Sequence, residues 1–596
     1  GPAYVYCMRS LKGGADEMKK LLVYLKDYKK ESILSPLFKL LEASFELFVP
    51  LVMAAIIDVG IANSDKPYII KMCGVLILLA VIGLTCSITA QYFAAKAAVG
   101  FATKLRHALF EHIENLSYTE IDTIGTSTMI TRMTSDINQT QSGVNMVLRL
   151  FLRSPFIVFG AMVMAFTVDV KAALIFVVTI PVLAVVVFGI MLITIPLYKK
   201  VQAGLDTVLG ITRENLTGSR VIRAFHKEDE EIETFHEKNE ALTVLQRYVG
   251  KISALMNPVT YIIINVALIA LIWTGALQVD KGVISQGQVV ALVNYMSQIL
   301  IELVKLANLI ITVTKAVACG NRIESVLEIS SSMKDGTKTQ GLDQSEYAVC
   351  FEDVSMGYKG GGAYALNHVN LKVRHGETVG IIGGTGSGKS TVINLIPRFY
   401  DVSEGAVLVD GVDVRDYQME ALRAKIGIVP QKSVLFSGTI RDNLKWGKED
   451  ATEEELQEAI RIAQAKEFVE QKEGKLDAWI EQNGRNLSGG QKQRLTIARA
   501  LGKKPEILIL DDSASALDYA TDAALRRSIR EMEQAPAVFI VSQRAASILH
   551  ASQILVLDDG EVAGLGTHEE LLRNCEVYQE IYYSQFSKEE GQEALA

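Results

Sequence analysis

Long runs without a charged residue mark the first half of the chain. Four such runs occupy residues 72–95, 172–198, 252–279 and 282–301. Each reaches the roughly 20 residues that a helix needs to cross about 30 Å of hydrocarbon. Two weaker runs, 33–61 and 148–168, contain a few charged residues and complete the set. The pattern predicts six membrane-spanning helices between residues 30 and 320, because four such runs rarely occur together in a soluble helical bundle.

The loops between the predicted spans alternate between long and very short. About 50 residues separate the second span from the third, and the fourth from the fifth. These long loops are rich in Lys and Arg, which places them, both termini and everything after residue 320 in the cytoplasm of a multi-pass plasma-membrane protein. They contain almost no Pro and space Leu, Glu and Lys three and four residues apart. We therefore expect the helices to extend into the cytoplasm and to turn at 117–127 and 218–224.

The sequence changes character after Ile329. Residues 330–345 are rich in Ser, Lys, Asp and Gly and are typical of a linker. From 346 to 596, short β-type runs alternate with helical ones, which predicts an α/β domain with a largely parallel sheet. The expected strands are 369–373, 378–382, 406–410, 425–429, 507–510, 537–541 and 553–557. The all-α six-helix domain is expected over residues 18–329, and residues 1–17 are interpreted as a tag or a disordered terminus.

Composition excludes several classes of partner and site. The formal net charge of −8 gives no support to a nucleic-acid partner. The six Cys residues stand singly along the chain, without a CxxC pair. This spacing predicts neither a zinc site nor a disulfide framework.

A glycine-rich loop follows the predicted strand 378–382 and leads into a helix. It has the G-x-x-x-x-G-K-S pattern in the strand–loop–helix context that phosphate binding requires. Glycines let backbone N–H groups converge on phosphate oxygens, and the helix N-terminus adds its positive end. Lys389 is suited to the β- and γ-phosphates and the Ser390 hydroxyl to Mg²⁺. The predicted nucleotide-binding residues of this loop are Gly383, Gly384, Thr385, Gly386, Ser387, Gly388, Lys389, Ser390 and Thr391.

Two carboxylates end the predicted strand 507–510. Asp511 and Asp512 follow the hydrophobic run directly. A carboxylate at the C-terminal edge of a sheet can hold Mg²⁺ directly or through water. Taken alone, the pattern also fits a strand that ends in a polar turn. Beside a phosphate-binding loop, it predicts that Asp511 is a magnesium ligand.

Residues 486–491 read Asn-Leu-Ser-Gly-Gly-Gln and resemble the signature sequence of ATP-binding-cassette (ABC) transporters. With six preceding spans, the chain resembles an exporter half-transporter from about residue 20 to 585. The resemblance implies a P-loop nucleotide-binding domain of the ABC type, with ATP and Mg²⁺ as cofactors and an ATPase coupled to transport. It also implies a dimer, in which each nucleotide lies between the phosphate loop of one chain and the signature of the other. The implied signature contacts are Ser488, Gly489, Gly490 and Gln491.

The resemblance assigns further roles by position. Tyr358 matches the aromatic residue on which adenine stacks, with a core tyrosine as the alternative. Gln431 matches the Q-loop residue that senses magnesium and the transmembrane domain. Glu481 matches an acidic residue that contacts the long intracellular helices, with an ordinary exposed Glu as the alternative. Ser515–Asp518 matches the D-loop, and the turns at 117–127 and 218–224 resemble coupling helices that dock beside the Q-loop.

Two positions depart from the family pattern. The family's catalytic Glu should follow Asp511, where this chain has Asp512, and its switch His should follow strand 537–541, where this chain has Gln543. Asp is one methylene shorter than Glu, and Gln cannot change its charge near neutral pH. We therefore hypothesise a hydrolysis-poor site on this chain and a non-identical partner half-transporter with intact Glu and His. A homodimer with two slow sites, or another assembly, remains the alternative.

The transported substance is not fixed by the sequence. Glu42, Glu46 and Glu302 lie within predicted spans, where ionisable groups usually face a cavity or a partner. Carboxylates facing a cavity would suit cationic amphipathic drugs, whereas Glu302 could instead pair with Lys305. Efflux of a hydrophobic or amphipathic small molecule from the lipid is the main expectation. A lipid or peptide exporter and an ATP-gated regulatory membrane protein are the alternatives.

Overall fold

The computed structural model of the chain describes residues 20–342, 344–513 and 515–586, which form two compact units. The first contains residues 20–114 and 127–329, and the second contains residues 115–126 and the chain from 330 onward. The sequence led us to place 115–126 with the helical unit. The structure groups this segment with the α/β unit, because its side chains contact that unit. The predicted tag at 1–17 lies outside the described residues.

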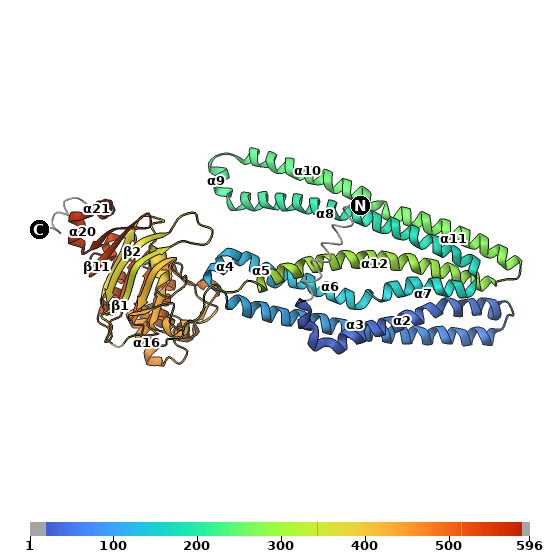
Figure 1. The fold of residues 1–596 in the computed structure, drawn as a ribbon, viewed down its shortest axis with the longest axis horizontal. Coiled ribbons are helices and arrows are strands. Elements are labelled where there is room, and N and C mark those ends of the chain that lie inside the picture. The colour runs from blue at the N-terminus through green and yellow to red at the C-terminus, as the bar shows by residue number, and fades with distance from the viewer. Residues whose placement is uncertain (1–19, 343, 514, 587–596) are drawn as a thin grey trace. The chain divides into compact units, whose positions relative to one another are not determined.

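Six helical segments in the described part of the chain are long and apolar enough to cross a membrane, as predicted (Figure 1). Helix α3 has 49 residues, or about 70 Å at 1.5 Å per residue, so it extends well beyond a bilayer core. The spans are α2 (Lys29–Ala55), α3 (Lys66–Glu114), α6 and α7 (Ile137–Leu150 and Arg153–Val168), α8 (Val170–Thr217), α10 and α11 (Glu228–Ala254 and Met256–Asp280) and α12 (Gln286–Leu327).

Short helical segments connect or extend the spans. At the two predicted turns lie α4 (Tyr118–Ile124) and α9 (Ser219–Ala224), and α5 (Thr126–Thr131) follows α4. Short 3₁₀ or π segments cover Leu22–Tyr28, Ile56–Ile61 and Arg132–Asp136.

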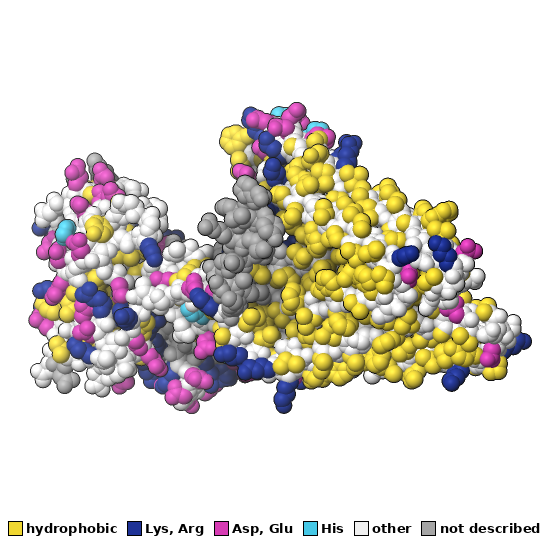
Figure 2. All heavy atoms as spheres, turned by 45° about the vertical axis from the view of Figure 1, so that its right-hand side comes forward, with side chains coloured by type: hydrophobic (Ala, Val, Ile, Leu, Met, Phe, Trp, Pro, Cys, Tyr) yellow, Lys and Arg dark blue, Asp and Glu magenta, His cyan; other side chains and the backbone are white. Residues whose placement is uncertain are grey.

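Hydrophobic side chains cover most of the visible outer surface of the long helices (Figure 2). Small residues are buried between the helices. On α3, Ala90, Ala94 and Ala97 are fully buried. Alanines spaced three and four residues apart share one helix face and let a neighbouring backbone approach closely. This distribution is the one expected for helices that are surrounded by lipid.

The second unit contains a six-stranded sheet in the order β12-β11-β3-β10-β9-β6. All neighbours in it are parallel except β11 and β12. The strands β3, β9 and β10 are buried almost throughout, as expected for a parallel sheet covered on both faces. The strands are β3 (Thr378–Gly383), β6 (Ile426–Val429), β9 (Ile507–Asp511), β10 (Ala537–Val541), β11 (Gln553–Asp558) and β12 (Glu561–Gly566).

Two strands that we expected in the parallel sheet lie elsewhere. Residues 369–373 and 406–410 fall largely in β2 (Leu366–Arg374) and β4 (Glu404–Val409), which belong to a separate antiparallel sheet ordered β2-β1-β4-β5. The remaining strands there are β1 (Tyr347–Met356), which was not predicted, and β5 (Val412–Asp413). Buried and exposed residues alternate along much of β2, which is the pattern of a sheet with one covered face.

Helices and one small two-stranded sheet complete the second unit. The sheet pairs β7 (Gly438–Thr439) with β8 (Trp479–Ile480). The helices are α13 (Lys389–Leu395), α14 (Met419–Lys425), α15 (Ile440–Lys445), α16 (Glu453–Ile462), α17 (Lys466–Glu470), α18 (Gly489–Leu501), α19 (Tyr519–Arg530), α20 (His568–Asn574) and α21 (Glu576–Tyr583).

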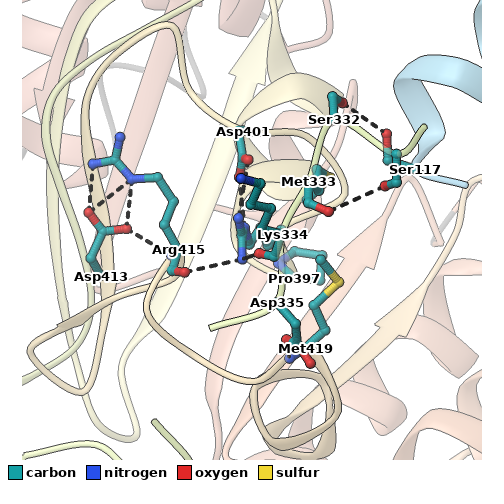
Figure 3. A network of polar contacts seen from close by, with 12 residues as sticks. Ser117, Ser332, Met333, Lys334, Asp335, Pro397, Asp401, Asp413, Arg415 and Met419 are labelled. Carbon is teal, nitrogen blue, oxygen red and sulfur yellow. Dashed lines mark hydrogen bonds and ion pairs between the residues drawn. The ribbon is translucent and has the colours of Figure 1, made fainter. Parts of the chain in front are cut away.

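The segment that follows residue 330 is held against the second unit (Figure 3). The carbonyl of Lys334 accepts a hydrogen bond from the buried Arg398 at 3.0 Å. The carboxylate of Asp335 accepts one from the backbone N–H of Met419 at 2.7 Å. Backbone bonds from Gly336 and Thr337 to the 416–417 backbone continue the attachment. The beginning of the predicted linker is therefore fixed to one unit.

Candidate nucleotide site

Three neighbouring parallel strands bring the sequence-predicted residues to one edge of the sheet. Strand β10 lies between β3 and β9, and Val541 is paired with both Ile381 and Asp511. The N–H of Asp512 donates to the carbonyl of Val541 at 2.9 Å. The carboxyl ends of parallel strands form the usual ligand edge of an α/β sheet. The phosphate loop, the two aspartates and Gln543 therefore emerge side by side.

The phosphate loop has a backbone that only glycine accommodates at two positions. Gly386 and Gly388 have φ values of 83° and 94°. A Cβ on Gly388 would lie 2.6 Å from the carbonyl oxygen of Ala365. The Nζ of Lys389 donates to the Gly383 carbonyl at 2.9 Å, so its charge lies inside the loop. The loop thus gathers a cation and the start of a helix where an anion would bind.

The two aspartates and Lys389 influence one another. Burial raises the pKa of Asp511, and repulsion from Asp512 raises it further, while Lys389 opposes the shift. Hydrogen bonds from the Ser390 side chain and the Gln431 backbone also lower the pKa of Asp511. Burial lowers the pKa of Lys389, and the two carboxylates oppose that shift. These partners show that Ser390, Gln431 and Asp511 lie together, as the predicted metal set requires.

The oxygen atoms gathered here fit Mg²⁺. This ion usually binds one or two protein oxygens and completes its shell with water and substrate phosphates. The Ser390 hydroxyl and the Asp511 carboxylate are ligands of that kind. In the described part of the chain, no group of three or more His, Cys, Asp or Glu forms a metal site by itself. A magnesium ion carried by a nucleotide suits this donor set, because phosphates and water would complete its shell.

Asp512 occupies an unusual backbone position. Its φ is 46°, and Ser515 donates to its carbonyl through both the backbone N–H and the hydroxyl, at 3.2 and 2.8 Å. Asp tolerates this left-handed region better than most residues. Burial raises the pKa of Asp512, while a hydrogen bond from the Gln431 side chain and the charges of Arg544 and Lys389 oppose the rise.

Gln543 and Arg544 follow strand β10. The Gln543 carbonyl accepts a hydrogen bond from the side chain of Gln585 at 2.8 Å. Arg544 was not predicted as a site residue, although its position next to Gln543 could have indicated that it lies near the site. Glu481 is exposed, and its backbone N–H donates to the side chain of Asn486 at 3.1 Å.

Tyr358 lies against the helix that begins at the phosphate loop. Its hydroxyl lies 3.0 Å from that of Thr391, and the side chain is partly exposed. Its ring is nearly perpendicular to that of Tyr400, with centroids 5.1 Å apart. Tyr400 was not predicted as a site residue, because no local pattern identifies it. The position of Tyr358 suits a residue that stacks on a base next to the phosphate site.

The signature residues form the N-terminus of α18. Ser488 caps this helix in a complete capping box with Gln491, in which the N–H of each residue donates to the side-chain oxygen of the other. Leu487 is buried and anchors the turn, while Ser488 and Gly489 are exposed. A Cβ on Gly490 would lie 3.1 Å from the Ala516 carbonyl in the predicted D-loop. The first residues of this helix are therefore open to solvent.

The carboxylates of the spanning helices are paired. Arg153 lies 2.7 Å from both Glu46 and Glu302, and Lys305 lies 2.8 Å from Glu302. Glu42 pairs with Lys39 at 2.6 Å. The expectation that these carboxylates attract a cationic drug is weakened, because each already has a basic partner. Arg153 lies within the weaker predicted run 148–168, and the sequence indicated no partner for it.

Two family descriptions match the chain. They are "ABC transporter transmembrane region" over residues 32–303 and "ABC transporter" over residues 366–515. An uncharacterized ABC transporter ATP-binding protein of Mycobacterium tuberculosis is 37% identical over 566 residues, which cover 94% of this chain and 97% of that protein. This chain belongs to the ABC transporter family. Its six spans followed by one cassette are the arrangement of an exporter half-transporter.

Other relatives of this ABC transporter have more specific names. An ATP-dependent lipid A-core flippase of Desulfotalea psychrophila is 34% identical, over 80% of this chain and 84% of that protein. A putative multidrug export ATP-binding/permease protein of Bacillus subtilis is 32% identical, over 95% of this chain and 98% of that protein. The solved structure of a bacterial Atm1-family ABC exporter with ATP bound has a TM-score of 0.76 and 23% identity. It covers 94% of this chain and 99% of its own, which shows the exporter fold.

Membership establishes the general activity of this ABC exporter. It is an ATPase coupled to transport across a membrane and uses ATP with Mg²⁺. The six spans make it a multi-pass membrane protein, and its nucleotide-binding domain lies in the cytoplasm.

Proposed function

We propose that this chain is the hydrolysis-poor half of a heterodimeric exporter. Its phosphate loop, with Lys389, binds ATP, and Tyr358 stacks on the adenine. Ser390, Gln431 and Asp511 hold the accompanying Mg²⁺, which neutralises charge on the phosphates when it is bound. The exposed N-terminus of α18, with Ser488, Gly489, Gly490 and Gln491, completes the competent site of a non-identical partner.

The observation that carries this proposal is the grouping of the two departures around one phosphate loop. Asp512 and Gln543 follow adjacent strands, β9 and β10, while the signature turn keeps its full capping box. A general base must lie within about 2.6–3.2 Å of the water proton that it accepts. A displacement of about 1 Å can cost on the order of 10²-fold in rate. A shorter acid and a switch residue without a titratable ring would weaken hydrolysis here and leave binding intact.

The transport step follows from the coupling of nucleotide binding to the state of the helices. ATP shifts the balance toward a closed dimer only to the extent that it binds this state more tightly than the open one. Closure favours the outward-facing state, and hydrolysis at the partner's site resets the transporter. We propose amphipathic small molecules as the substrate class, since the relatives include proteins named as a lipid flippase and a multidrug exporter.

The proposal is tested by ATPase assays on the full chain in lipid nanodiscs, alone and together with its partner. We expect little turnover from the chain alone and substrate-stimulated turnover from the pair. In the pair, Lys389→Ala should lower turnover much less than the corresponding Lys→Ala in the partner. Equal losses from the two substitutions, or comparable turnover from the isolated chain, would exclude the division of labour.

A homodimeric lipid exporter is the second candidate, favoured by the similarity to a protein named as a flippase. The decisive measurement is the mass of the ATP-hydrolysing complex purified through a tag on this chain. Two copies of this chain with full turnover would select the homodimer.

A further inference from the structure

A cavity beside Tyr358 is lined by helix α4 as well as by the cassette. Its volume is about 410 Å³, within the range of about 300–1,000 Å³ that is typical of small-ligand pockets. Helix α4 contributes Thr119, Asp122 and Thr123, and the opposite side contains Tyr358 and Tyr400. All of these residues belong to the second unit, so the cavity lies within one compact body.

A continuous set of contacts joins α4 to the phosphate-binding helix. The Tyr400 hydroxyl donates to the carboxylate of Asp122 at 2.6 Å. The Tyr400 ring meets the Tyr358 ring at 85°, an edge-to-face arrangement that aromatic pairs prefer. Tyr358 in turn reaches Thr391, two residues after Lys389. Burial and the hydrogen bond to Asp122 raise the pKa of Tyr400, so its hydroxyl remains a donor at physiological pH.

Separate contacts fix α4 on this surface. The ring of Tyr118 lies 4.7 Å from that of Phe399, and the guanidinium of Arg423 lies 5.4 Å from the centre of the Phe399 ring. The hydroxyl of Ser117 lies 3.3 Å from that of Ser332, as Figure 3 shows. Because α4 is held at several points, the bond between Asp122 and Tyr400 connects two ordered elements.

We propose that α4 forms a wall of the adenine pocket and that Tyr400, through its bond to Asp122, is a positioning residue for Tyr358. This inference rests on the proposed role of Tyr358 as the base-stacking residue. Base binding and the docking of α4 are then linked, and each strengthens the other by the same factor. The helix that connects two membrane spans thus detects the base directly, in addition to any signal from the phosphates.

The test compares a nucleotide with a probe that lacks a base. Binding of the non-hydrolysable ATP analogue AMP-PNP and of inorganic tripolyphosphate is measured by calorimetry on the full chain in nanodiscs. Tyr400→Phe and Asp122→Ala should each weaken AMP-PNP binding about fivefold, as expected for one lost hydrogen bond. The double variant should bind no more weakly than either single variant, because both remove the same interaction. Asp122→Asn, which keeps an acceptor oxygen, should restore most of the affinity, and tripolyphosphate binding should be the same in all variants.

Tyr364→Phe is the matched control, since its hydroxyl donates to Glu404 at 3.3 Å and it does not line the cavity. Equal losses for AMP-PNP and tripolyphosphate, or additive losses in the double variant, would overturn the inference. Tyr358→Ala distinguishes the stacking role of Tyr358 from the role of α4. If it leaves AMP-PNP affinity unchanged, the stacking role in the proposed function fails. If it lowers the affinity while the Tyr400 and Asp122 variants bind normally, only the role of α4 fails.

Discussion

Arg153 donates to the carboxylate of Glu302 at 2.7 Å and thereby joins the start of α7 to α12. Both side chains are almost fully buried, with 8% and 3% of their surfaces exposed. Ser154 also donates to Glu302, at 2.9 Å. The pair lies where α7 begins after the break at 151–152 in the third span. It therefore holds an interrupted helix against its neighbours.

Arg153→Met should strongly destabilise the protein. Removing one member of a buried ion pair costs about 3–5 kcal/mol when the other charge is left alone, and here Glu302 would keep only the contact with the more exposed Lys305 and the hydrogen bond from Ser154. We expect a clear fall in the thermal unfolding temperature in detergent, with partial recovery in the double variant Arg153→Met/Glu302→Gln. The exposed Arg213→Met is the control. If Arg153→Met alone unfolds like the wild type, the pair has no structural role.

Glu46→Gln should leave the efflux of cationic dyes unchanged. Glu46 is paired with Arg153 and is 40% exposed, and Gln keeps an oxygen that can accept from the guanidinium. Because Glu46 is partly exposed to solvent, its contact with Arg153 should contribute close to what a surface ion pair does, about 1 kcal/mol or less. Transport of a cationic dye and of an uncharged amphiphile is measured in the same vesicles. A selective loss of the cationic dye would show that this carboxylate contacts substrate.

Asp512→Glu combined with Gln543→His should raise hydrolysis in this chain's own pocket. The longer acid recovers about 1 Å of reach, which can change the rate by on the order of 10²-fold. Glu accepts a φ of 46° less readily than Asp, so a small loss of thermal stability should accompany the gain. The same variant with Lys389→Ala should fall back to the baseline. Unchanged turnover would place the defect of this site elsewhere.

Ser488→Ala should impair the heterodimer beyond its effect on stability. The loss of an N-cap costs about 1 kcal/mol of helix stability. Thr567→Ala removes an equivalent capping box from α20 and is the matched control. We expect similar melting temperatures for the two variants, but a much lower ATPase rate for Ser488→Ala in the assembly. Equal ATPase rates would argue against a role for this turn in the partner's site.

The stability of the second unit should decrease as the pH falls below about 6.5. Burial lowers the pKa of His568 from 6.5, and its ring lies 2.8 Å from the Tyr578 hydroxyl. The unfolded chain therefore binds this proton at a higher pH than the folded chain does, and the stabilisation is lost as the pH falls through the folded value. Thermal unfolding between pH 7.5 and 5.5 measures the slope. His568→Gln should flatten it, and an unchanged slope in this variant would contradict the prediction.

The spans and the phosphate loop could be predicted because their signals are local. A charge-free run or a glycine pattern depends only on neighbouring residues, and Gly388 is required by its own backbone conformation. The partners of Arg153 could not be predicted, since they come from α2 and α12, far away in sequence. The antiparallel sheet was not predicted, because the sequence does not show which strands pair with one another. Strands 369–373 and 406–410 were therefore assigned to the parallel sheet. Tyr400 carries no pattern that separates it from any other tyrosine.

The grouping of residues 115–126 with the cassette has a mechanical consequence. The polypeptide passes from one unit to the other at 114/115, 126/127 and 329/330, so three covalent connections join the two bodies. A protease cut near residue 330 would leave two of them intact. The end of α3 and the start of α5 would still connect the cassette to the membrane helices after the connection at 329/330 is cut.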